Sequence, residues 1–205
     1  DDVRGMNVAI AWQPMSFSLI SHTSFSVPMP DASQRPTRRI LLCSGRIAGG
    51  DTLDVLMLHF PSRRGGKSAD PLRQAAVKTV VRVCDSLQHC RRRPHIIVMG
   101  DCNATPTDRQ LLPLRSAGLR YVPAVIPAGS PVGGTYLFRN NWSCIDQMWT
   151  CGEFRGMECQ VFVRDYMLER NADGLPVPFR TYRGPSYHGG YSDHLPLVAR
   201  FFLDF

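Results

Sequence analysis

Short apolar runs separated by turn-forming residues dominate the first third of the chain. Such runs occupy residues 8–12, 17–21, 40–44 and 53–59. Gln13 and Pro14 lie between the first two runs, and Gly49, Gly50 and Asp51 lie between the last two. Turn formers between apolar runs are typical of β-hairpins. The pattern therefore predicts two antiparallel strand pairs, joined by a proline-rich loop over residues 27–36.

A change to helical spacing follows these strands. Residues 70–89 open with Asp70 and Pro71, a residue pair suited to a helix N-terminus. Apolar side chains then recur at helical spacing, at Leu72, Ala76, Val80, Val83 and Leu87. The stretch predicts an amphipathic helix. It leads into residues 95–100, an apolar run typical of a buried strand.

The rest of the chain predicts further strands with one more helix. A helix is expected over residues 105–117, and strands over residues 135–138, 144–150, 159–163 and 195–203. Residues 170–191, rich in Gly, Pro and Tyr, are expected to form a long loop. With 205 residues, 43% of them hydrophobic, the chain predicts one compact domain over residues 1–205.

No apolar run reaches the roughly 20 residues that a membrane-spanning helix requires, and residues 1–5 carry no apolar signal core. The chain does not begin with Met, so we expect a processed product or a fragment whose start lies upstream. The seven cysteines show no C-x-x-C pair, and most are expected to be buried thiols.

The net charge of +7 favours phosphate-bearing partners. Basic residues gather in three clusters, at Arg35, Arg38 and Arg39, at Arg63, Arg64 and Lys67, and at Arg91, Arg92 and Arg93. The alternative is that these are solvated surface charges. Charge alone does not decide between the two.

Four segments end an apolar run with polar groups suited to phosphate chemistry. They are residues 58–63, 99–103, 144–147 and 191–196. Taken singly each is weak, because a histidine after a strand is more often a structural hydrogen bonder, and an Asp-x-Asn after a strand is more often a turn cap. Their order along the chain is more specific.

That order is His59, then Gly-Asp-x-Asn at residues 100–103, Gly-Thr-Tyr at 134–136 with Ile-Asp at 145–146, and Ser-Asp-His-Leu-Pro at 192–196. It resembles the endonuclease/exonuclease/phosphatase family, which has the DNase I-like fold. The resemblance implies a two-sheet α/β sandwich of mainly antiparallel strands, with the first strands missing from this chain. The site would lie where these loops meet at the sheet ends.

The resemblance also assigns roles to residues. Asp101 would orient or deprotonate the attacking water, and Asn103 would donate a hydrogen bond to that water or to a phosphoryl oxygen. His194 would face the phosphate as a cation held by Asp146. His59 would donate to a phosphoryl or leaving oxygen.

Asp193 is the metal-binding candidate, for Mg²⁺ or Mn²⁺, directly or through water. The family's principal metal ligand is a glutamate that lies ahead of the segment at which this chain begins. The glutamates of this chain, Glu153, Glu158 and Glu169, lie far downstream of that position. Losing a ligand matters because Mg²⁺ uses only one or two carboxylates.

Arg63 and Arg64 are candidate substrate-binding residues, since guanidinium groups bind phosphate in a bidentate way, with surface charge as the alternative. Tyr136 and Trp142 could pack a base or sugar, with core packing as the alternative.

The sequence thus predicts a metal-dependent phosphoester hydrolase, a nuclease or phosphodiesterase, in which water attacks phosphorus. Its partner would be a phosphoester substrate, with nucleic acid favoured by the charge. The alternatives are a catalytically inactive phosphate- or nucleic-acid-binding module and an incomplete fragment. An exposed sheet edge left by missing strands could also support self-association.

Overall fold

A six-stranded sheet forms the centre of the computed structural model, which describes residues 5–29, 36–63, 66 and 69–203. The strands, in their order across the sheet, are β1 (Phe17–Phe25), β2 (Ile40–Ile47), β3 (Thr52–His59), β4 (Ile96–Asp101), β8 (Asp146–Cys151) and β5 (Arg120–Val122). Only the β3–β4 pair is parallel, and the other neighbours are antiparallel. The sheet is therefore mainly antiparallel, as predicted.

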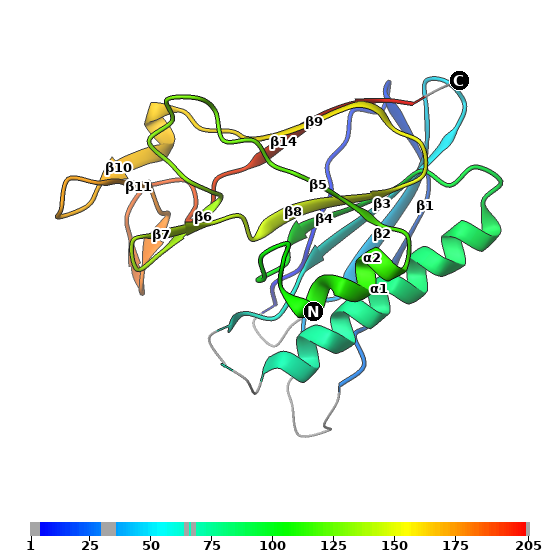
Figure 1. Ribbon diagram of the computed structural model, residues 1–205, viewed down its shortest axis with the longest axis horizontal. Helices are drawn as coiled ribbons and strands as arrows, with labels where there is room; N and C mark the ends of the chain where they lie inside the picture. Colours follow the sequence, from blue (N-terminus) through cyan, green and yellow to red (C-terminus); the bar gives the residue numbers. More distant parts are fainter. Residues whose placement is uncertain (1–4, 30–35, 64–65, 67–68, 204–205) are drawn as a thin grey trace.

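Helix α1 (Asp70–Cys90) supplies the crossover that the parallel pair β3–β4 requires. Pro71 lies in its first turn, and its buried face includes Ala76, Val80, Cys84 and Leu87. These side chains pack with Trp149 and the inner residues of β3 and β4 in one continuous core. The short helix α2 (Leu112–Ser116) lies on the same face of the sheet (Figure 1).

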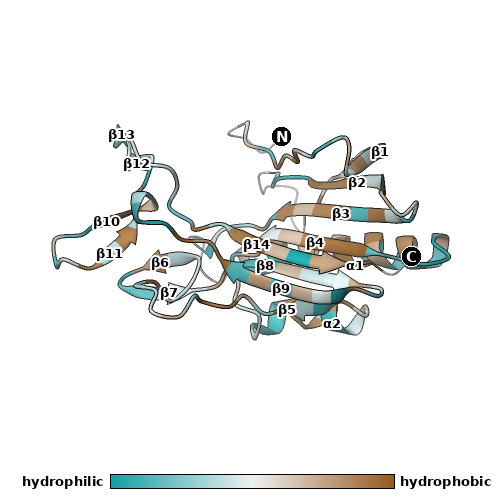
Figure 2. Cartoon of the chain, turned by 90° about the horizontal axis from the view of Figure 1, so that it is seen from above, coloured by the Kyte–Doolittle hydropathy of each residue, from teal (hydrophilic) through white to brown (hydrophobic). Residues whose placement is uncertain are grey.

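The opposite face of the sheet is covered by an antiparallel pair, β9 (Arg155–Val161) and β14 (Leu197–Phe202). Partly buried and exposed residues alternate along β14, and Leu197, Ala199 and Phe201 pack into a second core against the central sheet. Figure 2 shows this pair crossing over the central strands. The layers are helix, sheet and sheet, so the predicted α/β sandwich is confirmed.

Small hairpins extend from one end of the sandwich (Figure 1). They are formed by β6 (Tyr136–Phe138) with β7 (Asn141–Ser143), β10 (Leu168–Arg170) with β11 (Pro176–Pro178), and β12 (Tyr182–Arg183) with β13 (Ser186–Tyr187). Two 3-10 turns, η2 (Arg109–Leu111) and η3 (Asp165–Met167), complete the described elements. None of the described helices is long and apolar enough to cross a membrane.

Three sequence-based expectations differ from the structure. Residues 8–12 form no strand and are mostly exposed, and β1 pairs with β2 instead. The backbone carbonyl of Gln13 accepts bonds from the Ser16 and Phe17 amides, which closes a turn at the start of β1. The helix expected over residues 105–117 shortens to η2 and α2, and the loop over residues 170–191 contains two small hairpins.

A buried ion pair lies at the end of β3 remote from His59. The Asp54 side chain is fully buried, and the Arg91 guanidinium binds its two oxygens at 2.8 and 2.9 Å. The Ser44 hydroxyl donates to the same carboxylate. Arg91, from the third basic cluster, thus has a structural role at the end of α1.

Candidate active site

Strand register brings the predicted polar residues together at one end of the central sheet. His59, the last residue of β3, is in register with Asp101, the last residue of β4. Asp101 in turn faces Asp146, the first residue of β8. A cavity of about 710 Å³ lies over these strand ends, and its lining includes His59, Asp101, Asn103, Asp146, Asp193 and His194. The structure therefore places all six predicted residues around one cavity.

Gly100 is required for the position of Asp101. Its φ angle is +139°, and a Cβ atom built on it would lie 1.9 Å from the Leu58 carbonyl oxygen. Any other residue would push β4 away from β3 just before the polar end of the strands. The glycine of the Gly-Asp-x-Asn motif thus serves the backbone, not the chemistry.

Residues 101–103 form a tightly bonded loop after β4. The Asn103 backbone N–H donates to Asp101 Oδ1 at 2.7 Å, and the Asn103 side-chain amide donates to Asp101 Oδ2 at 3.0 Å and to the Phe60 carbonyl at 2.9 Å. Asn103 has a φ of +46°, a conformation that Asn tolerates better than most residues. The amide nitrogen is thus engaged in fixing the Asp101 carboxylate.

The environment of Asp101 raises its pKa. Burial is the largest cause, the nearby charge of Asp146 adds to it, and the Asn103 backbone hydrogen bond and the His194 charge oppose it, leaving a pKa of about 6. A carboxylate with this pKa is ionised at neutral pH and is a better proton acceptor than an ordinary aspartate.

His194 and Asp146 form a hydrogen-bonded pair beside Asp101. His194 Nδ1 lies 2.8 Å from Asp146 Oδ2, and the His194 backbone N–H donates to the Ser192 hydroxyl at 3.0 Å. The ring also packs against Tyr136, with ring centroids 4.6 Å apart. A β-bridge between residues 136 and 194 fixes this arrangement.

Burial of the imidazole would by itself lower the pKa of His194. The hydrogen bond to Asp146 and the charges of Asp146, Asp101 and Asp193 outweigh burial, so the pKa of His194 is raised from its ordinary value. His194 therefore carries positive charge more readily than an ordinary histidine. His59 also contacts Asp101, with its Nε2 atom 3.3 Å from Asp101 Oδ2.

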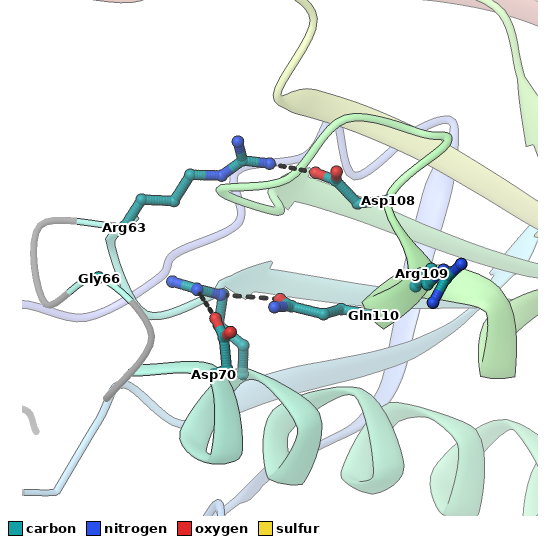
Figure 3. Close-up of a pocket in the computed structure, with 7 residues that line it drawn as sticks. Arg63, Gly66, Asp70, Asp108, Arg109 and Gln110 are labelled. Atoms are coloured by element: carbon teal, nitrogen blue, oxygen red, sulfur yellow. Dashed lines mark hydrogen bonds and ion pairs between the residues drawn. The ribbon is translucent and has the colours of Figure 1, made fainter.

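Arg63 holds the loop that follows Asp101. Its Nε donates to the Asn103 carbonyl at 2.7 Å, and its guanidinium forms an ion pair with Asp108. Asp108 also accepts the Thr105 backbone N–H at 2.7 Å. Figure 3 shows Arg63 reaching across to Asp108. The guanidinium of Arg63, which was expected to bind phosphate, is therefore engaged in holding this loop, a role that sequence reasoning missed. Arg64, the other predicted substrate-binding residue, lies outside the described residues.

Arg73 supports the same region from α1. Its side chain is buried, forms an ion pair with Asp70, and donates to Gln110 Oε1 at 2.9 Å and to the Ser62 carbonyl at 3.1 Å. No motif marks Arg73 in the sequence, because its role depends on how α1 meets the loop after β3. Arg38, from the first basic cluster, lines the cavity directly.

Asp193 is a carboxylate of the cavity that could hold a hydrated divalent cation. Among the residues that the structure describes, no three His, Cys, Asp or Glu side chains form a ready metal-binding group. The Asp193 side chain is 49% exposed, and its ion-pair partner, Arg180, lies at 4.0 Å. Since Mg²⁺ commonly keeps several waters and one or two carboxylates, Asp193 can serve as such a ligand.

Several solved structures share this fold at low sequence identity. Truncated TDP2 from Caenorhabditis elegans superposes with a TM-score of 0.59 at 14% identity, covering 92% of this chain and 67% of that one. A mannosyl-6-phosphatase from Bacteroides thetaiotaomicron gives 0.58 at 16% identity, covering 94% and 69%. Beta toxin from Staphylococcus aureus gives 0.55 at 15% identity, covering 78% and 56%.

The fold is the two-sheet α/β sandwich of these solved structures, and it carries His-Asp and Asp-Asn pairs at one sheet end. No curated protein matches the chain in sequence. The model of the endonuclease/exonuclease/phosphatase family matches residues 1–202. The chain belongs to this family.

Proposed function

We propose that this protein hydrolyses a phosphodiester or phosphomonoester by in-line attack of water on phosphorus, with Mg²⁺ or Mn²⁺ bound. The observation that carries the proposal is the convergence of Asp101, Asn103, His59 and the His194–Asp146 pair on one cavity at the strand ends. The fold alone would not support it, because one fold serves many functions.

Asp101 is the proposed general base. It accepts a proton from the attacking water as the water oxygen bonds to phosphorus, and the bond from phosphorus to the leaving oxygen breaks. Its raised pKa of about 6 suits this role near neutral pH. Asn103 fixes the direction of the carboxylate through its two hydrogen bonds to it.

The two histidines are the proposed stabilisers of negative charge. His194, whose pKa is raised by the hydrogen bond to Asp146, faces the phosphoryl oxygens, and His59 donates to a phosphoryl oxygen or to the leaving oxygen. A divalent ion at Asp193 would supply Lewis-acid polarisation of a phosphoryl oxygen. The excess of positive charge on the chain favours a nucleic acid as the phosphodiester.

Hydrolysis of bis-p-nitrophenyl phosphate and plasmid DNA, with Mg²⁺, with Mn²⁺ and with EDTA, tests the proposal. We expect metal-dependent turnover that falls about 10²–10⁴-fold in Asp101→Asn, the usual contribution of a general base. We expect a fall of about 10²–10³-fold in His194→Gln. Arg92→Gln is the matched control, because Arg92 is exposed at the end of the sheet remote from the cavity.

Retained phosphate binding without turnover in any metal would instead support the alternative, a binding module without catalysis. The same assay on a longer protein, extended upstream of residue 1, separates that outcome from a chain that needs further residues for activity. Turnover that Asp101→Asn and His194→Gln leave unchanged would refute the assigned roles.

A further inference from the structure

A second cavity lies beside the catalytic one. Its volume is about 520 Å³, and it shares Ser62, Asn103, Tyr136 and Ile145 with the lining of the catalytic cavity. The two cavities therefore adjoin at these residues. The second cavity is thus the neighbouring space for the organic group of a molecule whose phosphate lies near Asp101.

The β6–β7 hairpin supplies one wall of this second cavity. Tyr136 is in register with Ser143, and Phe138 with Asn141. Residues two apart on a strand face the same side, so two aromatic rings and two hydrogen-bonding side chains share one surface. Figures 1 and 2 show the hairpin beside the end of the sheet at which β8 begins.

Phe138 has no role in the core. Its side chain is 57% exposed, although it lines the cavity, and it belongs to none of the described core clusters. An exposed aromatic ring next to a catalytic cavity offers a stacking surface to a ligand. Tyr136 differs, because its ring is already stacked on His194.

Arg139 adds positive charge to the same wall. Its guanidinium lies over the Phe138 ring, 5.2 Å from the ring centroid, and no carboxylate among the described residues pairs with it. The hairpin turn holds it there, with positive φ angles at Arg139 and Asn140. A cation stacked on an aromatic ring suits an anionic ligand that also carries a planar group.

We propose that the second cavity binds the base of a nucleotide whose phosphate occupies the catalytic cavity, with Phe138 as the stacking residue. The inference rests on the proposed function, since it takes the catalytic cavity as the phosphate site. Asn141 and Ser143 supply donors and acceptors for the edge of a base, and Arg139 supplies charge for a neighbouring phosphate. A lipid tail would gain nothing from these polar groups.

Calorimetric binding of adenosine 5′-monophosphate and of ribose 5-phosphate tests the proposal, because the two share sugar and phosphate and differ in the base. Titrations in EDTA prevent metal-dependent turnover, and a second set uses Mg²⁺ with Asp101→Asn. We expect the nucleotide to bind between about 5- and 100-fold more tightly, the range of base stacking on an aromatic side chain. Phe138→Ala should remove most of this preference, and Phe138→Trp should keep it.

Phe202→Ala is the matched control, because Phe202 is another exposed aromatic residue, on β14 and outside both cavities. Equal binding of the two ligands, binding of neither, or a preference that survives Phe138→Ala would overturn the proposal. Turnover of bis-p-nitrophenyl phosphate with equal binding would refute the base site alone. A base preference without turnover of any phosphoester would refute the proposed function and leave the base site standing.

Discussion

The substitution Asp101→Asn should stabilise the folded protein at neutral pH while it slows hydrolysis. The Asp101 side chain is 10% exposed, and the fold raises its pKa from 3.8 to about 6. Because the folded pKa is the higher one, the fold favours the protonated carboxyl. The contribution of the protonated Asp101 carboxyl to the free energy of unfolding is complete below about pH 4 and is lost as the pH rises through 6.

The magnitude follows from the size of the shift. Each pKa unit corresponds to about 1.4 kcal/mol, so a shift of about two units is worth about 3 kcal/mol. Asparagine cannot ionise and therefore avoids this loss. Its NH₂ group would, however, face the Asn103 amide, which now donates to Asp101 Oδ2, so we expect a net gain of about 1–2 kcal/mol near pH 8.

Urea unfolding of both proteins in EDTA, between about pH 4 and pH 8, measures this effect. The difference in free energy of unfolding between variant and wild type should change by about 3 kcal/mol across that range. Phe202→Ala is the control, since Phe202 is exposed and has no ionisable group, and its difference in free energy of unfolding should not vary with pH. A difference for Asp101→Asn that does not vary with pH would refute the reasoning.

Three further predictions concern other parts of the molecule. Arg63→Ala and Asp108→Ala should each lower kcat about tenfold, and the double variant should lower it no further, because both side chains hold the loop of residues 101–103. A rise in KM for Arg63→Ala alone would indicate that Arg63 binds phosphate instead. Asp146→Asn should lower the pKa of His194, so that the alkaline limb of the pH profile of kcat/KM moves to lower pH. An alkaline limb that does not move would contradict the role of the His194–Asp146 pair. Arg91→Ala should lower the free energy of unfolding in urea by about 3 kcal/mol, because it leaves the Asp54 carboxylate buried and unpaired. Arg92→Ala, at an exposed residue, should lower it by less than about 0.5 kcal/mol. Equal losses would show that the ion pair contributes little.

The sequence determined the elements whose pattern is local. Helical spacing in residues 70–89 and apolar runs in residues 40–44, 53–59 and 95–100 predicted α1, β2, β3 and β4 within a few residues. Residues 8–12 misled, because an apolar run does not by itself decide strand pairing: β1 pairs with β2 on one side, and residues 8–12 do not join its other edge. The order of short motifs identified the family, and the structure gathers those motif residues around one cavity.

The contacts within the site were decided by tertiary structure. Nothing in the sequence relates Arg63 to the Asn103 carbonyl, 40 residues away. Nor does it mark Phe138 as an exposed wall of a cavity beside the one at the strand ends. The raised pKa of Asp101 likewise depends on burial and on the register that sets Asp146 opposite it. Local patterns fix which residues form strands and helices, but distance, burial and charge between remote segments exist only once those elements pack.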